Sequence, residues 1–369
     1  MMRTALSLIA FASLSPSALA QTPVSSDWIT HSVPVTDTRA IRPHRPECPV
    51  EVLEYKTPIG APEPRAAVLL IPGLFQNSVI FDLLPAQGIS LATYLQREKH
   101  VRVYALHVRG IGRSCYPGSL SLDDLAIDDI PTAIRFVEQR EGRPIIPLGH
   151  SQGGMTLQAA LSGLTRCSYA RNCFKESVAA ELQNHIRSAG ILAANADLSE
   201  VENKLLWLSW VDVVLPFAAP FMDRITAGYT VKNIPRGAES ELWETAFHIP
   251  NTTPESRSAF FNKTLDSSTL DILNQFGDAI RRDGLRNSGQ EKYISGLKWI
   301  RTPTSEIVFE LDQFAPPIST ERDNFAHIGS PQKKFFTVTG QGHLDFTMNP
   351  SMHADLSEFM DWLIAHGEP

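Results

Sequence analysis

The sequence predicts an α/β fold: a mostly parallel, doubly wound sheet covered by helices, with an inserted, mainly helical cap. Short β-branched runs alternate along the chain with longer segments of helical periodicity, which is typical of a parallel sheet covered by helices. Most runs are apolar on both faces, as expected of strands buried between two helical layers. The expected strands are Val50 to Tyr55, Ala66 to Ile71, Val101 to Leu106, Pro144 to Leu148, Ser188 to Ala193, Glu306 to Glu310 and Lys334 to Val338.

Length and composition limit the function classes. The chain has 369 residues, of which 43% are hydrophobic and 20% charged, and this mix excludes a disordered or collagen-like protein. Its 33 basic and 40 acidic residues give a net charge of -7. Without a basic surplus, neither nucleic acid nor an anionic membrane is an expected partner.

The first twenty residues have the pattern of a signal peptide. Arg3 precedes an apolar run from Ala5 to Leu14, and Ala18-Leu19-Ala20 has the small-x-small form at which signal peptidases cut. Cleavage after Ala20 predicts a secreted or periplasmic protein. The next longest apolar stretch, Leu205 to Met222, is interrupted by an aspartate and two prolines, so no membrane-spanning segment is expected in the mature chain.

Export makes disulfides the expected fate of the four cysteines, which allow three pairings. Cys167 and Cys173 are six residues apart and are the favoured pair, which leaves Cys48 with Cys115. Free buried thiols are the alternative. The chain has no paired C-x-x-C and no H-E-x-x-H, so we predict no zinc site.

The strand and helix pattern divides the chain into five parts. Residues 1–20 form the signal peptide, and residues 21–48 are predicted to be an irregular arm because they are rich in Pro, Ser, Thr and Arg. Residues 49–197 and 302–369 form the two parts of the α/β core. Between them, residues 198–301 lack a convincing strand and are predicted to be the cap. Four aromatic residues of this cap are candidates for substrate binding: Trp207, Trp210, Phe217 and Phe221.

Local signals also predict where helices begin. Ser121 with Asp124 three residues later forms a potential capping box. Pro131 is expected in the first turn of the next helix, where its missing N–H costs little. Leu157, Leu161 and Leu164 form an apolar stripe after residue 151.

The chemistry is concentrated in Gly149-His150-Ser151-Gln152-Gly153, between an apolar run and an amphipathic helix. A serine on so tight a strand-to-helix turn needs glycines on both sides, and its hydroxyl is then exposed at the carboxyl edge of the sheet. The pattern predicts that Ser151 is a nucleophile; the alternative is a plain glycine-rich turn.

A nucleophilic serine requires a base and a group that orients the base. His343 follows the last expected strand in a glycine-rich loop, where a doubly wound sheet gathers its functional residues. We expect it to be the base, with His353 and His327 as weaker candidates. For the orienting acid, Asp312 follows the preceding strand. Glu310 and Asp345 remain alternatives.

The oxyanion of the tetrahedral intermediate needs two donors. The backbone N–H of Gln152 is one. The loop Pro72 to Asn77 supplies the other, with Leu74 as the expected backbone donor. The side chain of Gln76 or Asn77 is an alternative donor.

Together these motifs resemble the α/β-hydrolase superfamily, and within it the acid lipases of the gastric and lysosomal type. The resemblance covers about residues 66–164 and 303–346 and fades in the cap. Two departures stand out: Pro72-Gly73 replaces the His-Gly of the family, and Phe309 replaces a glycine three residues before the acid. The matching segments are Gly149 to Gly153 with G-H-S-Q-G, His343 to Phe346 with H-L-D-F, Ser121 to Ala126 with S-F-D-E-M-A, Asp129 to Pro131 with D-L-P, and Arg109-Gly110 with Ser114 for R-G-N-x-x-S.

The resemblance implies the α/β-hydrolase fold, esterase or lipase activity and a triad of Ser151, Asp312 and His343, with Leu74 and Gln152 as oxyanion donors. The sequence thus predicts an exported carboxylic-ester hydrolase that works through an acyl-serine intermediate, with a small-molecule or lipid-like substrate and no metal or organic cofactor. The apolar cap favours a hydrophobic acyl or aromatic group. Acyl transfer, thioester cleavage and amide cleavage would use the same triad, and a non-catalytic binding protein on this fold is a distant alternative. The natural ester and the oligomeric state do not follow from the sequence.

Overall fold

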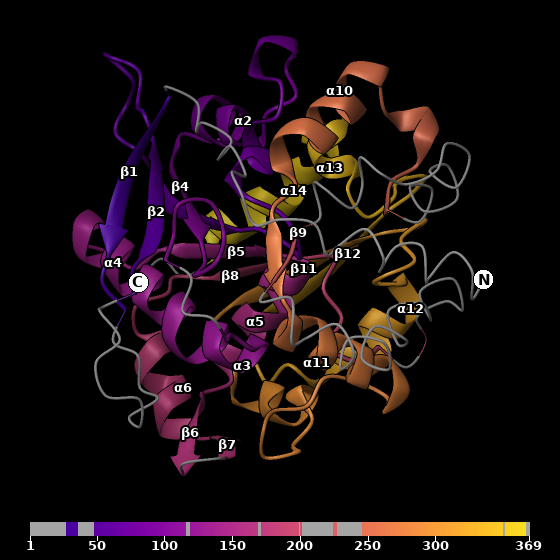
Figure 1. Ribbon diagram of the computed structural model, residues 1–369. Helices are drawn as coiled ribbons and strands as arrows, with labels where there is room; N and C mark the ends of the chain where they lie inside the picture. The colour runs from indigo at the N-terminus through magenta and orange to yellow at the C-terminus, as the bar shows by residue number, and fades with distance from the viewer. Residues whose placement is uncertain are drawn as a thin grey trace.

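The computed structural model describes residues 27–35, 48–115, 119–168, 171–198, 200, 224–226, 246–349 and 351–366, with only the backbone at 224–226. Its centre is an eight-stranded sheet with the order β1-β2-β4-β3-β5-β8-β11-β12 (Figure 1). The six strands from β4 to β12 run parallel to one another, while β2 pairs antiparallel with both β1 and β4. The predicted mostly parallel sheet is therefore confirmed. The strands of this sheet are β1 (Trp28–Val33), β2 (Val50–Tyr55), β3 (Ala66–Ile71), β4 (Val101–His107), β5 (Ile146–His150), β8 (Ala189–Leu192), β11 (Thr304–Phe309) and β12 (Lys333–Val338).

Helices cover both faces of the sheet, and each face has its own apolar core. One core joins α4, α5, α6 and α11 to the sheet, and the other joins α2, α13 and α14. β3 shows why the centre is stable: all six of its side chains are buried between the two layers. The α-helices are α2 (Leu91–Glu98), α3 (Leu122–Asp124), α4 (Ile130–Glu141), α5 (Gln152–Leu161), α6 (Glu176–Gln183), α10 (Pro254–Ala259), α11 (Leu270–Arg281), α12 (Pro317–Ser319), α13 (Asp345–Met348) and α14 (Met352–Ala365).

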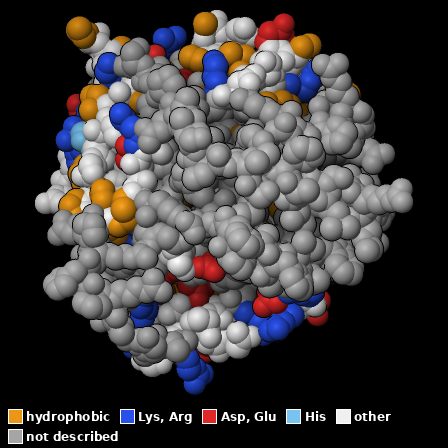
Figure 2. Space-filling model, viewed as in Figure 1, with side chains coloured by type: hydrophobic (Ala, Val, Ile, Leu, Met, Phe, Trp, Pro, Cys, Tyr) orange, Lys and Arg blue, Asp and Glu red, His pale blue; other side chains and the backbone are white. Residues whose placement is uncertain are grey.

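Short 3₁₀ and π turns connect these helices to the sheet, and two small sheets lie outside the main one. The turns are η1 (Ser78–Asp82), η2 (Pro85–Gln87), η3 (Leu125–Asp129), η6 (Ile249–Asn251), η7 (Phe260–Thr264), η8 (Tyr293–Trp299), η9 (Thr320–Asn324) and η10 (Phe325–His327). The small sheets pair β6 (Leu164–Ser168) with β7 (Arg171–Phe174) and β9 (Arg224–Thr226) with β10 (Ser267–Thr269). On the face seen in Figure 2, the described side chains along the upper edge mix hydrophobic, basic and acidic groups.

Of the three predicted helix signals, two are confirmed and the third is confirmed in part. Ser121 and Asp124 form a reciprocal capping box at the start of α3. Pro131 lies in the first turn of α4. Leu157 and Leu161 are buried in α5, but Leu164 already belongs to β6.

Two predictions about irregular segments are wrong. Within the arm predicted for residues 21–48, Trp28–Val33 forms edge strand β1, paired along its whole length with β2. Its polar residues give little strand signal, because the neighbouring strand supplies the pairing. In the predicted cap, β9 and β10 pair over only three residues each, too few to show a period. The cap boundaries stay a prediction, since most of residues 199–245 lie outside the described part.

Both favoured cysteine pairs are joined as disulfides: Cys48 with Cys115, and Cys167 with Cys173. The first ties the start of β2 to the loop after β4, and the second closes the turn between β6 and β7. Within the described residues, no helix is long and apolar enough to cross a membrane.

Candidate active site

Ser151 lies on the turn between β5 and α5, at the carboxyl end of the parallel strands. Its φ of 52° and ψ of -122° form a backbone conformation that non-glycine residues rarely adopt. The turn also requires the flanking glycines. A Cβ on Gly153 would lie 2.4 Å from the carbonyl oxygen of Ile71, and one on Gly149 would lie 2.6 Å from that of Gly153. Close packing of strand, turn and helix therefore explains the G-x-S-x-G pattern.

His343 and Asp312 form a buried hydrogen-bonded pair in the loops after β12 and β11. His343 Nδ1 lies 2.7 Å from Asp312 Oδ2. The other carboxylate oxygen of Asp312 accepts the backbone N–H groups of Phe314 and Ala315, at 2.7 and 3.0 Å. Since a carboxylate only accepts, His343 donates from Nδ1 and its Nε2 is left to take up a proton.

His150 connects the serine turn to the His343 loop. Its ring centroid lies 4.7 Å from that of His343, and its Nε2 is 3.3 Å from the His343 carbonyl oxygen. Burial, reinforced by the nearby His343, lowers the pKa of His150 well below its usual value. A neutral His150 fills the space between the two loops without adding charge. Among the described residues, no hydrogen bond is found between the Ser151 side chain and His343, so the contact of His150 with His343 is what joins the two loops.

The other candidate residues have different partners. Glu310 is exposed and accepts the backbone N–H of Gly340 at 2.7 Å. His353 stacks on Tyr94, with ring centroids 4.6 Å apart. His327 lies in η10, and no ring or hydrogen-bond contact to His343 is found for it in the described part of the chain. The fourth alternative, Asp345, begins α13 two residues after His343.

Asp345 supports the His343 loop by accepting three hydrogen bonds. Its donors are the N–H groups of Gly342 and His248 and the side-chain amide of Asn251, at 2.9, 3.0 and 2.7 Å. Asn251 also donates to the Gly340 carbonyl oxygen at 2.7 Å. Asp345 thus joins the loop to η6. The H-L-D-F segment indicated its importance, but no sequence signal identified Asn251 or His248.

The predicted oxyanion donors lie on both sides of Ser151. Gln152 is the first residue of α5, so its N–H has no acceptor within the helix. Leu74 follows Gly73, where an added Cβ would lie 3.2 Å from Ser151 Cβ. Gln76 Oε1 accepts the Gly73 N–H at 3.1 Å, which holds this loop in place.

The Asn77 side chain is hydrogen-bonded at both ends to groups away from Ser151. Its Oδ1 accepts the backbone N–H of Val79 at 3.0 Å and thereby caps η1. Its Nδ2 donates to the Lys263 carbonyl oxygen, also at 3.0 Å. The Asn77 side chain is therefore occupied by other partners, and the backbone of Leu74 and the side chain of Gln76 stay the predicted alternatives for the second donor.

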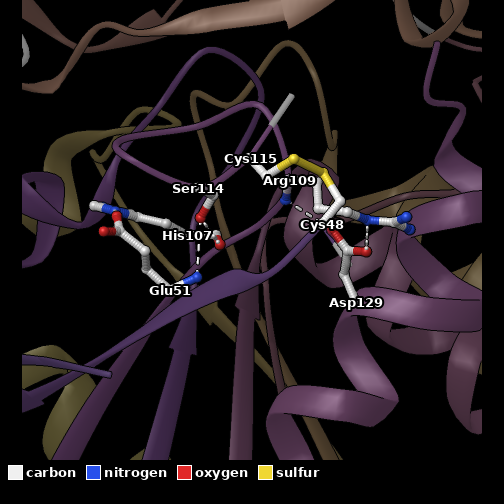
Figure 3. Close-up of a disulfide and its surroundings, with 7 residues drawn as sticks. All are labelled: Cys48, Glu51, His107, Arg109, Ser114, Cys115 and Asp129. Atoms are coloured by element: carbon white, nitrogen blue, oxygen red, sulfur yellow. Dashed lines mark hydrogen bonds and ion pairs between the residues drawn. A yellow bond between two sulfur atoms is a disulfide. The ribbon is translucent and has the colours of Figure 1, made fainter. Parts of the chain in front are cut away.

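The loop after β4 approaches the same site and is held from two sides (Figure 3). Arg109 is buried and bonds to Asp129 through its Nε at 2.6 Å and its backbone N–H at 2.8 Å. Ser114 donates to the His107 carbonyl oxygen and accepts the Glu51 N–H, at 2.7 and 2.9 Å. These contacts give a structural role to segments that the sequence marked only by resemblance.

The four aromatic candidates for substrate binding lie outside the described residues: Trp207, Trp210, Phe217 and Phe221. The predicted signal peptide, residues 1–20, lies outside them as well.

Comparison with known proteins agrees with this architecture. A family model of the alpha/beta hydrolase family matches residues 68–357. The chain belongs to this family, and it has the sheet order and the helical layers described above. A search of curated protein sequences found no significant match.

Solved structures with the same fold include esterases and lipases. A thermophilic esterase from Thermogutta terrifontis, with malate bound, has a TM-score of 0.56 at 16% identity, over 91% of this chain and 99% of that one. A monoacylglycerol lipase from Paleococcus ferrophilus has a TM-score of 0.52 at 18% identity, over 83% and 96%. A soluble variant of monoglyceride lipase from Saccharomyces cerevisiae, with a substrate analogue, has a TM-score of 0.55 at 15% identity, over 96% and 100%. At these identities the likeness establishes the fold alone. The acid-lipase subgroup remains only a resemblance.

Proposed function

We propose that the protein is an exported serine hydrolase that cleaves carboxylic esters through an acyl-serine intermediate. The observation that carries this proposal is the 2.7 Å hydrogen bond between His343 and Asp312, because the His343 carbonyl oxygen also lies 3.3 Å from the ring of His150, the residue before the strained Ser151. The esterases and lipases among the structural neighbours support the reaction class. The two disulfides and the signal-like first twenty residues support export.

In this mechanism the Ser151 hydroxyl attacks the ester carbonyl while His343 Nε2 accepts its proton. Asp312 holds the imidazole in the required tautomer and stabilises the imidazolium that forms. The N–H groups of Leu74 and Gln152 stabilise the oxyanion, and loss of one such donor typically costs about 3 to 4 kcal/mol in the transition state. His343 then protonates the leaving alcohol. Water, deprotonated by His343, releases the acid and restores Ser151.

The acyl group is proposed to be apolar. The support comes from the sequence of the predicted cap, which is rich in aromatic residues, and caps commonly shape the ligand pocket of such sheets.

The test combines a fluorophosphonate probe with p-nitrophenyl esters of graded chain length. We expect labelling of the wild type and none of Ser151→Ala. Asp312→Asn should lower kcat by about 10⁴-fold, because the imidazole then takes the wrong tautomer. Glu310→Gln is the matched control and should retain activity, since Glu310 faces Gly340. An unlabelled wild type that hydrolyses no ester would contradict the proposal, and the opposite ranking of the two carboxylate variants would move the acid to Glu310.

A further inference from the structure

The loop Pro72 to Asn77, which carries both alternatives for the second oxyanion donor, contains a strained residue. We call it the donor loop. Phe75 has a φ of 61°, a left-handed conformation that non-glycine residues rarely adopt. Such a conformation persists only where surrounding contacts fix it. The shape of the donor loop therefore depends on the segments that hold it.

One of these segments is the chain just before β10. The Asp266 N–H donates to the Phe75 carbonyl oxygen at 2.8 Å. The Asn77 N–H donates to the Thr264 carbonyl oxygen at 2.9 Å. These two bonds hold the donor loop through its backbone.

A side chain from the central sheet holds the residue that follows the donor loop. The backbone N–H of Ser78 donates to Nε2 of His107 at 2.9 Å. His107 is the last residue of β4 and is only 2% exposed. Because a backbone N–H can only donate, Nε2 carries no proton, and the neutral ring has its proton on Nδ1.

Glu51 on β2 selects the tautomer that this bond requires. Its Oε2 lies 3.1 Å from His107 Nδ1 (Figure 3) and also accepts the Arg113 N–H at 2.9 Å. Burial alone would raise the pKa of Glu51, but its bonds with His107 and Arg113 outweigh burial and lower this pKa below the usual value. The ionised carboxylate accepts the proton on Nδ1, so Nε2 is the nitrogen that faces Ser78 as an acceptor.

The turn after β4 is built around the His107 ring. Gly112 has a φ of 59°, and a Cβ there would lie 2.2 Å from His107 Nδ1. In the same turn, Ser114 donates to the His107 carbonyl oxygen and accepts the Glu51 N–H, which fixes the two backbones relative to each other. His107 thus presents its Nε2 from a rigid support.

We propose that His107, oriented by Glu51, is a positioning residue for ester hydrolysis: by holding Ser78, it holds the donor loop against Ser151. The donor loop is close enough for a shift to matter, because a Cβ on Gly73 would lie 3.2 Å from Ser151 Cβ. The role is the same whether Leu74 or Gln76 supplies the donor. The inference rests on the proposed ester hydrolysis and adds a residue outside the triad.

Two variants that differ by one methylene test this role. The amide of His107→Asn reaches the place of Nδ1 and can bond to Glu51, whereas the amide of His107→Gln reaches the place of Nε2 and can accept from Ser78. His107→Asn should lower kcat for p-nitrophenyl butanoate about 10- to 100-fold with KM changed less than about twofold, since a small misplacement of a catalytic group costs about that much. His107→Gln should stay within about threefold of the wild-type kcat.

Two further readouts separate positioning from general damage. Butylboronic acid forms a tetrahedral adduct with a nucleophilic serine, so its Ki should rise in His107→Asn by the factor by which kcat falls. Hydrogen exchange of the segment 73–82 should be faster in His107→Asn than in His107→Gln. His31→Asn is the matched control, because His31 forms a similar pair with Glu54 at 3.0 Å on β1 and β2, and it should change none of these values.

Equal impairment of the two His107 variants, in kcat or in folding, would overturn the inference, because the acceptor at the place of Nε2 would then have no separate role. A wild-type kcat or an unchanged boronate Ki in His107→Asn would overturn it as well. A wild type that is unlabelled and hydrolyses no ester would instead refute the proposed function. The exchange comparison needs no activity and would then still decide whether His107 holds the donor loop.

Discussion

Removing the disulfide between Cys48 and Cys115 should destabilise the protein about twice as much as removing the one between Cys167 and Cys173. The reason is the length of chain that each bond closes, 67 residues for the first pair and 6 for the second. A crosslink restricts the unfolded chain, and the restriction grows with the logarithm of the loop length. The two Cys→Ala double variants form a matched pair, because each removes one bond and two sulfur atoms.

The loop lengths set the magnitude. The chain-entropy relation gives about 4.4 kcal/mol for the long loop and about 2.2 kcal/mol for the short one at 25 °C. With an unfolding entropy of about 2.1 cal/mol/K per residue, a chain of 369 residues would lose about 6 °C and about 3 °C of Tm, respectively.

Calorimetry of the oxidised wild type and both double variants measures these shifts. The same proteins in excess dithiothreitol serve as controls, and there the differences should disappear. An equal or larger loss for the short loop would refute the loop-length argument. A wild type whose Tm is the same with and without reductant would refute the contribution of both bonds.

Two further predictions concern buried carboxyl groups. Burial raises the pKa of Glu306 well above its usual value; its stabilising contribution is therefore complete below about pH 4.5 and is lost as the pH rises through the raised pKa. Glu306→Gln, which cannot ionise, should match the wild-type Tm near pH 5 and exceed it at pH 9, and parallel Tm curves would contradict this. Asp345→Asn should lower kcat about 10-fold with KM changed less than about twofold. In either orientation the new NH2 group faces at least one of the N–H donors that Asp345 now accepts, which loosens the loop that carries His343. An unchanged kcat would rule out this positioning role.

Much of the fold could be predicted because its signals are local. Val50–Tyr55 and Ala66–Ile71 are strands with the predicted limits. Ala66–Ile71 is a continuous apolar run, which suits a strand that is buried on both faces. Ser121 and Asp124 cap α3 through contacts three residues apart. Trp28–Val33 was not predicted as a strand, because its polar residues break the apolar pattern. It forms a strand because the neighbouring β2 supplies its hydrogen bonds.

In the candidate site, too, some features follow from local sequence and others depend on contacts between distant segments. By itself, the sequence determined the turn at Ser151. A strand-to-helix turn this tight leaves no space for a Cβ at positions 149 and 153, so both must be glycine. Only the tertiary structure decided which carboxylate faces His343. Asp312 and Glu310 lie two residues apart after the same strand, and the packing of the β11 and β12 loops directs one towards the imidazole and the other towards Gly340. The pocket beside the serine turn is likewise a tertiary feature, since its walls come from segments that are distant in the sequence and that only the folded sheet brings together.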